Sequence, residues 1–263
     1  MDNRNPTDSS PAGAIPQVAF EHFSAWFGHT PALRDVNLEV HPHERLALIG
    51  YAGSGKTTLL RCLNRLHDLT PHFRKDGRIL LDGQDLHGPG IDVVSLRRRI
   101  GLVSATAGPL PGSVFDSIAL PLRMAGEQRL SRIQEQVELG LQRAFLWDDL
   151  KDRLQEPAFH LSPGKQRQLV LARALAFEPE IVLLDEPAAG LDYVALTLLE
   201  DVLDELKAKL TIVFATNDTK QAARASDRTA FFQKGELVEW GPTRQIFTHP
   251  ANALTNNFIT ERF

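Results

Sequence analysis

The residues with the clearest chemical use form one short run, which matches the pattern G-x-x-x-x-G-K-[ST] at every fixed position. The run is Gly50, Tyr51, Ala52, Gly53, Ser54, Gly55, Lys56 and Thr57. In such a loop, successive backbone N–H groups and the positive end of the next helix converge on phosphate oxygens. We expect Lys56 to lie against the β- and γ-phosphates of a nucleotide and the Thr57 hydroxyl to hold Mg²⁺. The run therefore predicts a phosphate-binding loop.

A second candidate site follows an apolar run later in the chain. Ile181–Leu184 predicts a buried strand, and Asp185 and Glu186 come directly after it. At such a strand end Asp185 can hold the Mg²⁺ shell, and Glu186 can orient or deprotonate an attacking water. Acids in this position are often only solvated turn residues. Their occurrence together with a phosphate loop favours the functional interpretation.

The segments that flank the loop are the ones that it requires. Leu46–Ile49 is short and apolar, which predicts a buried strand before the loop. After the loop, one helical face collects four leucines, Leu59, Leu60, Leu63 and Leu66. The alternative is a Gly-rich turn followed by a chance Lys-Thr pair, and the flanking strand and helix argue against it.

Strands and helices alternate along most of the chain. Turn signals and apolar runs predict strands at Val18–Phe23, Val36–Val40, Gly77–Leu81, Ile100–Val103, Thr211–Ala215, Thr229–Gln233 and Glu236–Trp240. Helical periodicity predicts helices at Ser113–Met124, Ser131–Ala144, Lys165–Ala176 and Val194–Lys209. Asp82-Gly83 and Lys234-Gly235 predict hairpin turns. The alternation predicts a largely parallel sheet covered by helices on both faces, with a helical insert at about 105–164.

Composition excludes several classes of function. The chain has 263 residues and a net charge of −4, which gives no electrostatic case for nucleic acid as a partner. Its single cysteine excludes an internal disulfide and fits a reducing compartment. No apolar run approaches the roughly 20 residues that span a bilayer. Residues 1–16 are polar and contain proline, so a disordered tail is expected there. Any membrane association should come through a partner.

Four segments come in the order and spacing of a known family: Gly50–Thr57, Leu161–Lys165, Leu183–Pro187 and Ala189–Asp192. In these segments the chain resembles the ATP-binding cassette (ABC) ATPases. The resemblance implies an α/β P-loop NTPase fold over 17–263, with an antiparallel β subdomain and an inserted helical subdomain.

Within that family, the chain resembles the ATP-binding subunit of bacterial phosphate importers from about Val18 onward. The similarity includes the passage Leu66–Gly83 and the runs Ser113–Ala119, Ala144–Asp152 and Gln221–Ala230. It is a general similarity and involves no phosphate-reading residue, because the transported ion does not touch this subunit.

The resemblance implies roles for further residues. Phe27 would stack on adenine, and the loop backbone as far as Thr58 would cradle the phosphates. Leu161–Lys165 matches the family's signature segment, so Ser162 and Gly164 would contact the γ-phosphate bound by the opposite subunit. The implied cofactors are ATP and Mg²⁺.

The resemblance also implies partners and a location. The loop at Asp192 would communicate between the two sites of a head-to-tail dimer, and the helical insert would dock on membrane-embedded permease subunits. The dimer could be a homodimer or a heterodimer with another ABC ATPase subunit. The subunit would be peripheral, on the cytoplasmic face of the inner membrane.

The chain departs from the family pattern at positions near the nucleotide. Ala105 stands where a Gln normally reaches the Mg²⁺ and the attacking water, and alanine has no polar side-chain atom. Asn217 replaces the His that contacts the γ-phosphate. Its neutral amide can still donate a hydrogen bond, so we assign Asn217 a weakened catalytic role beside Glu186.

The signature segment departs as well. Pro163 and Lys165 replace Gly and Gln, and Gln168 stands where Arg is usual. Proline removes one N–H from a helix start, although it is well tolerated in the first turn. Lys165 adds a positive charge that could partly offset the lost donor.

Two functions follow from this pattern. The favoured one is an ATP-hydrolysing peripheral subunit of an ABC importer, with inorganic phosphate as the preferred cargo and slow turnover because of the altered motifs. The alternative is a catalytically slow or inactive ATP-binding regulator that signals phosphate status or pairs with an intact ATPase. Glu186 argues for an enzyme, whereas Ala105, Pro163 and Asn217 argue for the regulator.

Overall fold

The computed structural model describes residues 15–262, so most of the tail predicted at 1–16 lies outside the described residues. The described chain divides into two compact units. Unit 1 contains the residues up to Val93 and those from Thr211 onward, and unit 2 is Val94–Leu210. The phosphate loop lies in unit 1, while the acids Asp185 and Glu186 lie in unit 2.

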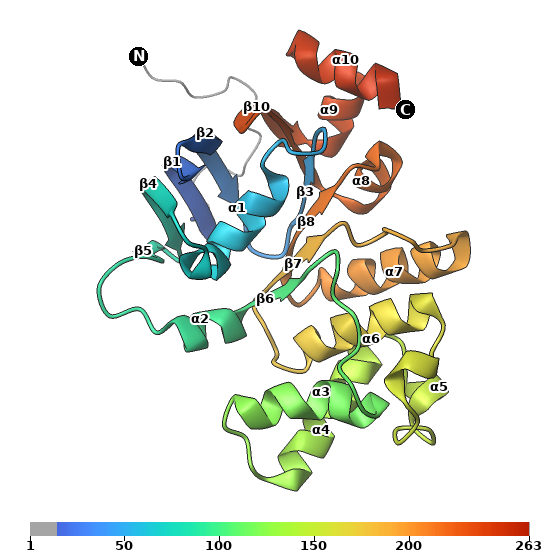
Figure 1. Cartoon of the computed structure of the whole chain (residues 1–263). Helices are drawn as coiled ribbons and strands as arrows, with labels where there is room; N and C mark the ends of the chain where they lie inside the picture. The colour runs from blue at the N-terminus through green and yellow to red at the C-terminus, as the bar shows by residue number, and fades with distance from the viewer. Residues whose placement is uncertain (1–14, 263) are drawn as a thin grey trace. The chain divides into compact units, whose positions relative to one another are not determined.

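Unit 1 is built on a mixed sheet. Its strands are β1 (Val18–Phe27), β2 (Thr30–Val40), β3 (Arg45–Ile49), β4 (Phe73–Leu81), β5 (Gln84–Asp85), β8 (Thr211–Thr216), β9 (Arg228–Gln233) and β10 (Glu236–Pro242). They lie in the order β5-β4-β1-β2-β10-β9-β3-β8 (Figure 1).

The pairing separates the sheet of unit 1 into two kinds of ladder. β1 pairs antiparallel with both β2 and β4, whereas β3 lies parallel between β8 and β9. The predicted largely parallel sheet is therefore wrong for this antiparallel part, and the antiparallel β subdomain that the family resemblance implied is confirmed. The two predicted hairpins are confirmed, because β4 pairs antiparallel with β5 and β9 with β10.

Short helices complete unit 1. They are α1 (Lys56–Leu63), the 3₁₀ turn η1 (Leu66–Leu69), α8 (Thr219–Ala225), α9 (Thr243–Thr248) and α10 (Ala253–Arg262). The predicted face through Leu66 is too long, because Arg65 adopts a φ of +59° and ends the helical path. Leu59, Leu60 and Leu63 are buried, as predicted, and Leu66 begins the separate turn η1.

Unit 2 pairs two parallel strands with a group of helices. The strands are β6 (Ile100–Val103) and β7 (Ile181–Asp185). The helices are α2 (Val93–Arg99), α3 (Val114–Met124), α4 (Leu130–Arg143), α5 (Trp147–Leu150), η2 (Ala158–His160), α6 (Pro163–Leu175) and α7 (Tyr193–Leu206). α3 begins at a capping box formed by Ser113 and Asp116, whose side chains bond each other's backbone N–H groups. Among the described residues, no helix is long and apolar enough to cross a membrane.

Candidate functional site

The phosphate loop connects β3 to α1 (Figure 1). It lies close to neighbouring backbone at both ends. Gly50 has a φ of 146°, and a Cβ added there would lie 2.1 Å from the carbonyl oxygen of Phe232. At the other end, a Cβ on Gly55 would lie 2.9 Å from the carbonyl oxygen of Ala32. Only glycine fits at either position. The backbone of the protein itself therefore requires glycine at positions 50 and 55, whether or not a ligand is bound.

Lys56 is folded back over the loop from the first turn of α1. Its Nζ donates hydrogen bonds to the carbonyl oxygens of Gly50 (2.8 Å) and Tyr51 (3.0 Å) and to Ser54 Oγ (3.4 Å). The side chain is 5% exposed. The partners named here are all oxygen acceptors, so an anionic phosphate could take their place with a gain in charge pairing.

Asn217 reaches the same ammonium group from the end of β8. Its Oδ1 accepts a hydrogen bond of 3.0 Å from Lys56 Nζ. Asn217, for which the family resemblance implied a γ-phosphate contact, thus lies beside the loop lysine. Asp218, next in the chain, caps α8 by accepting from the N–H groups of Lys220 and Gln221, and this cap fixes the turn that carries Asn217.

Phe27, the residue expected to stack on adenine, ends β1 within an aromatic cluster. Its ring centroid lies 5.0 Å from that of His67 and 5.4 Å from that of Phe73. His67 and Phe73 stack on each other at 4.9 Å. The cluster braces the Phe27 ring at the strand end. Its stacking on adenine stays a prediction.

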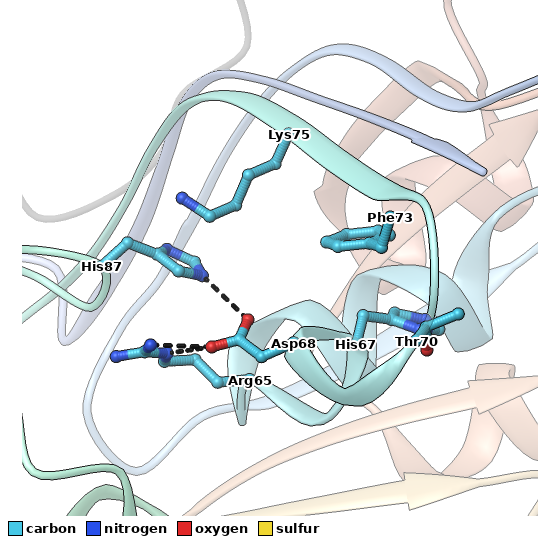
Figure 2. A pocket seen from close by; sticks show the side chains of 7 residues that line it. All are labelled: Arg65, His67, Asp68, Thr70, Phe73, Lys75 and His87. Carbon is cyan, nitrogen blue, oxygen red and sulfur yellow. Dashed lines mark hydrogen bonds and ion pairs between the residues drawn. The ribbon is translucent and has the colours of Figure 1, made fainter. Parts of the chain in front are cut away.

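Two of these aromatic residues also line a polar hollow of about 400 Å³ (Figure 2). Arg65 and Asp68, three residues apart in the chain, pair at 2.7 Å on one side of it, and Lys75 extends from the opposite side. Burial lowers the pKa of both His67 and His87 to about 4, so both rings are neutral at neutral pH. No residue of the phosphate loop lines this hollow. With both histidines neutral, the lining carries two positive side chains, Arg65 and Lys75, and one negative side chain, Asp68, and we assign no ligand to it.

In unit 2, Asp185 and Glu186 occupy the end of β7 as predicted. Asp185 is the last strand residue and is 4% exposed. Glu186 adopts a φ of +47°, a conformation uncommon for a residue other than glycine. The chain therefore turns away from the direction of β7 at Glu186, the candidate base. Strained backbone of this kind is frequent at functional sites.

Arg167 is a residue of this site that sequence reasoning missed. Its guanidinium donates to the carbonyl oxygens of Ser104 (3.0 Å), Ala105 (3.2 Å), Asp185 (3.2 Å) and Glu186 (3.1 Å). It therefore joins the segment after β6 to the end of β7. Burial lowers the pKa of the guanidinium, which remains positively charged at neutral pH.

The signal that could have identified Arg167 was its neighbour. Gln168 stands where the family usually has Arg, and an Arg stands one position earlier. In the structure Gln168 is buried and donates to the carbonyl oxygen of Ala144 at 3.2 Å. Arg167, one position earlier, carries a guanidinium that reaches four carbonyl groups.

The signature segment forms the start of α6. The Ser162 side chain caps the helix by accepting from the N–H of Lys165 at 3.5 Å, and Pro163 occupies the first turn. A Cβ added to Gly164 would lie 2.7 Å from the Cβ of Ala195 on α7, so this glycine is also required for helix packing. Lys165 Nζ lies 2.8 Å from Asp149 Oδ2. Its charge is engaged with α5, which weakens the expectation that it compensates for the proline.

The residues present fit a nucleoside triphosphate with Mg²⁺. The glycine cradle, Lys56 and the start of α1 match the shape and charge of phosphates. Thr57 of unit 1 has a hydroxyl and Asp185 of unit 2 has a carboxylate, and Mg²⁺ prefers oxygen donors of both kinds. Among the described residues, no group of three or more His, Cys, Asp or Glu could hold a metal.

Comparisons with known proteins agree with this geometry. The family model described as "ABC transporter" matches residues 33–189, more than half of the chain. CbiO1 from Clostridium perfringens, part of the ABC transporter complex CbiONQ, superposes with a TM-score of 0.77 at 25% identity, over 89% of this chain and 91% of its own.

A bacterial Atm1-family ABC exporter with ATP bound also superposes with a TM-score of 0.77, at 24% identity, over 94% of this chain and 42% of its own. At this level of identity the second match supports the fold alone. Together with the motif geometry, these findings show that the chain belongs to the ABC transporter family, as an ATP-binding domain with the ABC ATPase fold.

Proposed function

We propose that this chain is the ATP-binding and ATP-hydrolysing peripheral subunit of an ABC importer, and that the imported ion is inorganic phosphate. The observation that carries ATP binding is the phosphate loop, in which Lys56 is surrounded by oxygen acceptors above a cradle that only glycine fits. The family match supports the same activity. CbiO1, which belongs to the complex CbiONQ, supports a membrane-bound assembly with permease subunits and a place at the membrane surface.

The chain's own residues account for each part of this activity. Lys56 would leave its loop carbonyls and bind the β- and γ-phosphates, while Thr57 and Asp185 would provide oxygen ligands to Mg²⁺. Glu186 would accept a proton from the attacking water, with its backbone held by Arg167. Ser162 and Gly164 would act on the nucleotide of a second subunit. When bound, Mg-ATP supplies the phosphoanhydride bond whose cleavage drives the cycle.

Phosphate as the cargo is supported by similarity along the chain. The runs Ser113–Ala119, Ala144–Asp152 and Gln221–Ala230 resemble the phosphate-importer branch. In the structure the first two lie in and around α3 and α5, within the helical segment proposed to dock on the permease. The cargo itself would be selected by the permease.

A second candidate is a regulator that binds ATP and hydrolyses it slowly or not at all. Two contacts favour it. Asn217 holds Lys56 through its amide oxygen, and Asp149 holds the Lys165 ammonium. Asn217 and Lys165 stand at positions where the family pattern is altered, and both contacts occupy ammonium groups that would otherwise be available to phosphate.

Steady-state hydrolysis by the purified protein and by Glu186→Gln tests the enzymatic proposal. If Glu186 is the base, the substitution lowers turnover by about 10²–10⁴, the usual scale for loss of a general base. Activity that the substitution leaves unchanged would show that the base is wrongly assigned or that the activity belongs to a contaminant. ATP binding without measurable turnover in the wild type would favour the regulator.

The cargo is tested separately, by uptake of radiolabelled phosphate into cells that lack the gene. Restoration of uptake by wild-type protein but not by Glu186→Gln supports phosphate import. Uptake that does not depend on the gene would refute phosphate as the cargo and leave the ATPase assignment in place.

A further inference from the structure

Tyr51, the second residue of the phosphate loop, is attached to α10. Its Oη donates a hydrogen bond of 2.7 Å to Glu261 Oε2. Its ring packs edge-to-face on Phe258 with centroids 4.9 Å apart, and the guanidinium carbon of Arg262 lies 5.6 Å from its ring centroid. Tyr51 thus contacts three residues in the last two turns of α10, and one of them, Glu261, lies 210 positions further along the chain.

The helix on which Tyr51 rests is itself firmly held. Phe258 is 2% exposed and stacks on Phe231 of β9 with centroids 4.7 Å apart. At the end of α10, the carbonyl oxygen of Arg262 accepts a 3.1 Å hydrogen bond from Thr219 Oγ1. β9 pairs directly with β3, the strand that leads into the loop. Tyr51 is therefore attached to the sheet through α10.

The rest of the loop shows why this attachment matters. Gly50 is fixed against Phe232, and the carbonyl oxygen of Ser54 accepts a 3.0 Å hydrogen bond from the N–H of Gly235. Between these two points, Ala52 and Gly53 are exposed. The backbone carbonyl of Tyr51 is also one of the acceptors of Lys56. A displacement of Tyr51 therefore alters the position of the lysine.

We propose that Glu261 is a positioning residue for nucleotide binding, which holds the loop in its phosphate-binding conformation through the Tyr51 hydroxyl. The proposal rests on the ATP binding proposed above. A loop that is already ordered loses less conformational freedom when the ligand binds, so a tether at its exposed part increases affinity. The carboxylate makes the hydrogen bond stronger than a neutral acceptor would.

The charge of Glu261 acts in the opposite direction, because a carboxylate near the loop repels an anionic ligand. The test must therefore separate the acceptor from the charge. Glu261→Gln and Glu261→Ala remove the same charge, but only glutamine keeps an oxygen that can accept from Tyr51. Tyr51→Phe removes the hydroxyl without changing any charge, and it keeps the ring that packs on Phe258.

The experiment is titration calorimetry of Mg-ATP into the full-length wild type, both Glu261 variants, Tyr51→Phe, and Tyr51→Phe combined with each Glu261 variant. We expect Glu261→Ala to bind ATP about three- to tenfold more weakly than Glu261→Gln, the scale of one hydrogen bond. In the Tyr51→Phe background this difference should disappear. Asn257→Ala, at an exposed position of α10, serves as the control and should bind like the wild type.

Thermal unfolding of each variant shows whether an effect comes from general destabilisation of α10. A merely structural role of Glu261 would give the same difference between alanine and glutamine with and without the Tyr51 hydroxyl, and this result would overturn the proposal. Equal ATP affinity of all variants would overturn it too, while leaving ATP binding intact. A wild type that binds no ATP would instead refute the proposed function together with this inference.

Discussion

At the scale of single residues, the contact between Lys56 and Asn217 bears most directly on how the loop would bind phosphate. The lysine ammonium is shared among backbone carbonyls and the Asn217 amide oxygen. An imidazole at 217 could present an N–H to a phosphate, but here the amide oxygen faces a cation. A nucleotide must therefore displace Asn217 from Lys56 before Asn217 can turn its N–H₂ group to the γ-phosphate.

We predict that Lys56→Ala weakens Mg-ATP binding tenfold or more. The substitution removes charge-assisted hydrogen bonds, which contribute about 1.5–3 kcal/mol each. Titration calorimetry measures the effect. Lys220→Ala, at an exposed position of α8, removes the same charge away from the loop and provides the matched control. Equal affinity of the wild type and Lys56→Ala would contradict the assignment of the loop.

At the scale of elements, the turn between β2 and β3 carries an unusual carboxyl group. The side chain of Glu44 is 12% exposed, and burial raises its pKa from 4.5 to about 7 despite Arg228 at 3.9 Å. Between pH 4.5 and about 7, the folded state therefore holds the Glu44 proton more tightly than the unfolded state does. The contribution of Glu44 to stability is therefore most favourable below pH 4.5 and is lost as the pH rises through about 7.

We predict that Glu44→Gln removes this pH dependence, which amounts to roughly 3 kcal/mol between pH 4.5 and 7. His67 and His87 have the opposite effect, because their lowered pKa values of about 4 cost stability as the pH falls below 6.5. The informative quantity is thus the difference in free energy of unfolding between wild type and variant, from urea titrations near both ends of the range. Glu205→Gln, on the exposed side of α7, is the control. A difference that does not change with pH would refute the prediction.

The elements themselves could be predicted from the sequence wherever a local pattern fixes them. β3, β6 and β7 are short apolar runs, and α3, α4, α6 and α7 have helical periodicity, so their predicted limits fall within a few residues of those observed. α10 was missed because its buried face consists of Thr255, Phe258 and Ile259, and a polar threonine leaves too few apolar residues for the sequence to show a helical stripe. The end of α1 depends on a single residue, Arg65, in a left-handed conformation that no periodicity reveals.

The supporting contacts of the candidate site could not be predicted in the same way. The sequence identifies the phosphate loop and the acids because their types and spacing are specific. Arg167 acts through backbone carbonyls, which every residue has, so its partners leave no trace in the sequence. The pairs Lys165–Asp149 and Tyr51–Glu261 depend on how distant elements pack. They become visible only in three dimensions.

At the scale of the whole molecule, the altered residues would distribute unevenly over a head-to-tail dimer. Ala105 and Asn217 would affect the site on this subunit's own loop, whereas Pro163 and Lys165 would affect the site on the partner's loop. A homodimer would carry every alteration in both sites. A heterodimer with an intact paralogue would carry a subset in each site, and its activity could exceed that of the homodimer.

We predict that restoring Gln, Gly, Gln and His at Ala105, Pro163, Lys165 and Asn217 accelerates hydrolysis. Asn217→His should contribute most, because a donor aimed at developing charge is worth about 2.7–4 kcal/mol. The signature repair alone should contribute less, since Ser162 and Gly164 are already present. Single-turnover hydrolysis with the permease compares wild type, Asn217→His, the signature repair and the fourfold variant. A fourfold variant no faster than wild type would favour the regulator.

The position of the chain's single cysteine has a practical consequence. Cys62 lies in α1, is 2% exposed, and burial raises its thiol pKa far above its usual value. A thiol reagent can reach it only when the packing around α1 opens, so the labelling rate measures how often this opening occurs. The same helix starts at Lys56, so bound nucleotide should slow the labelling. The native protein thus carries its own reporter of nucleotide occupancy, with no engineered probe.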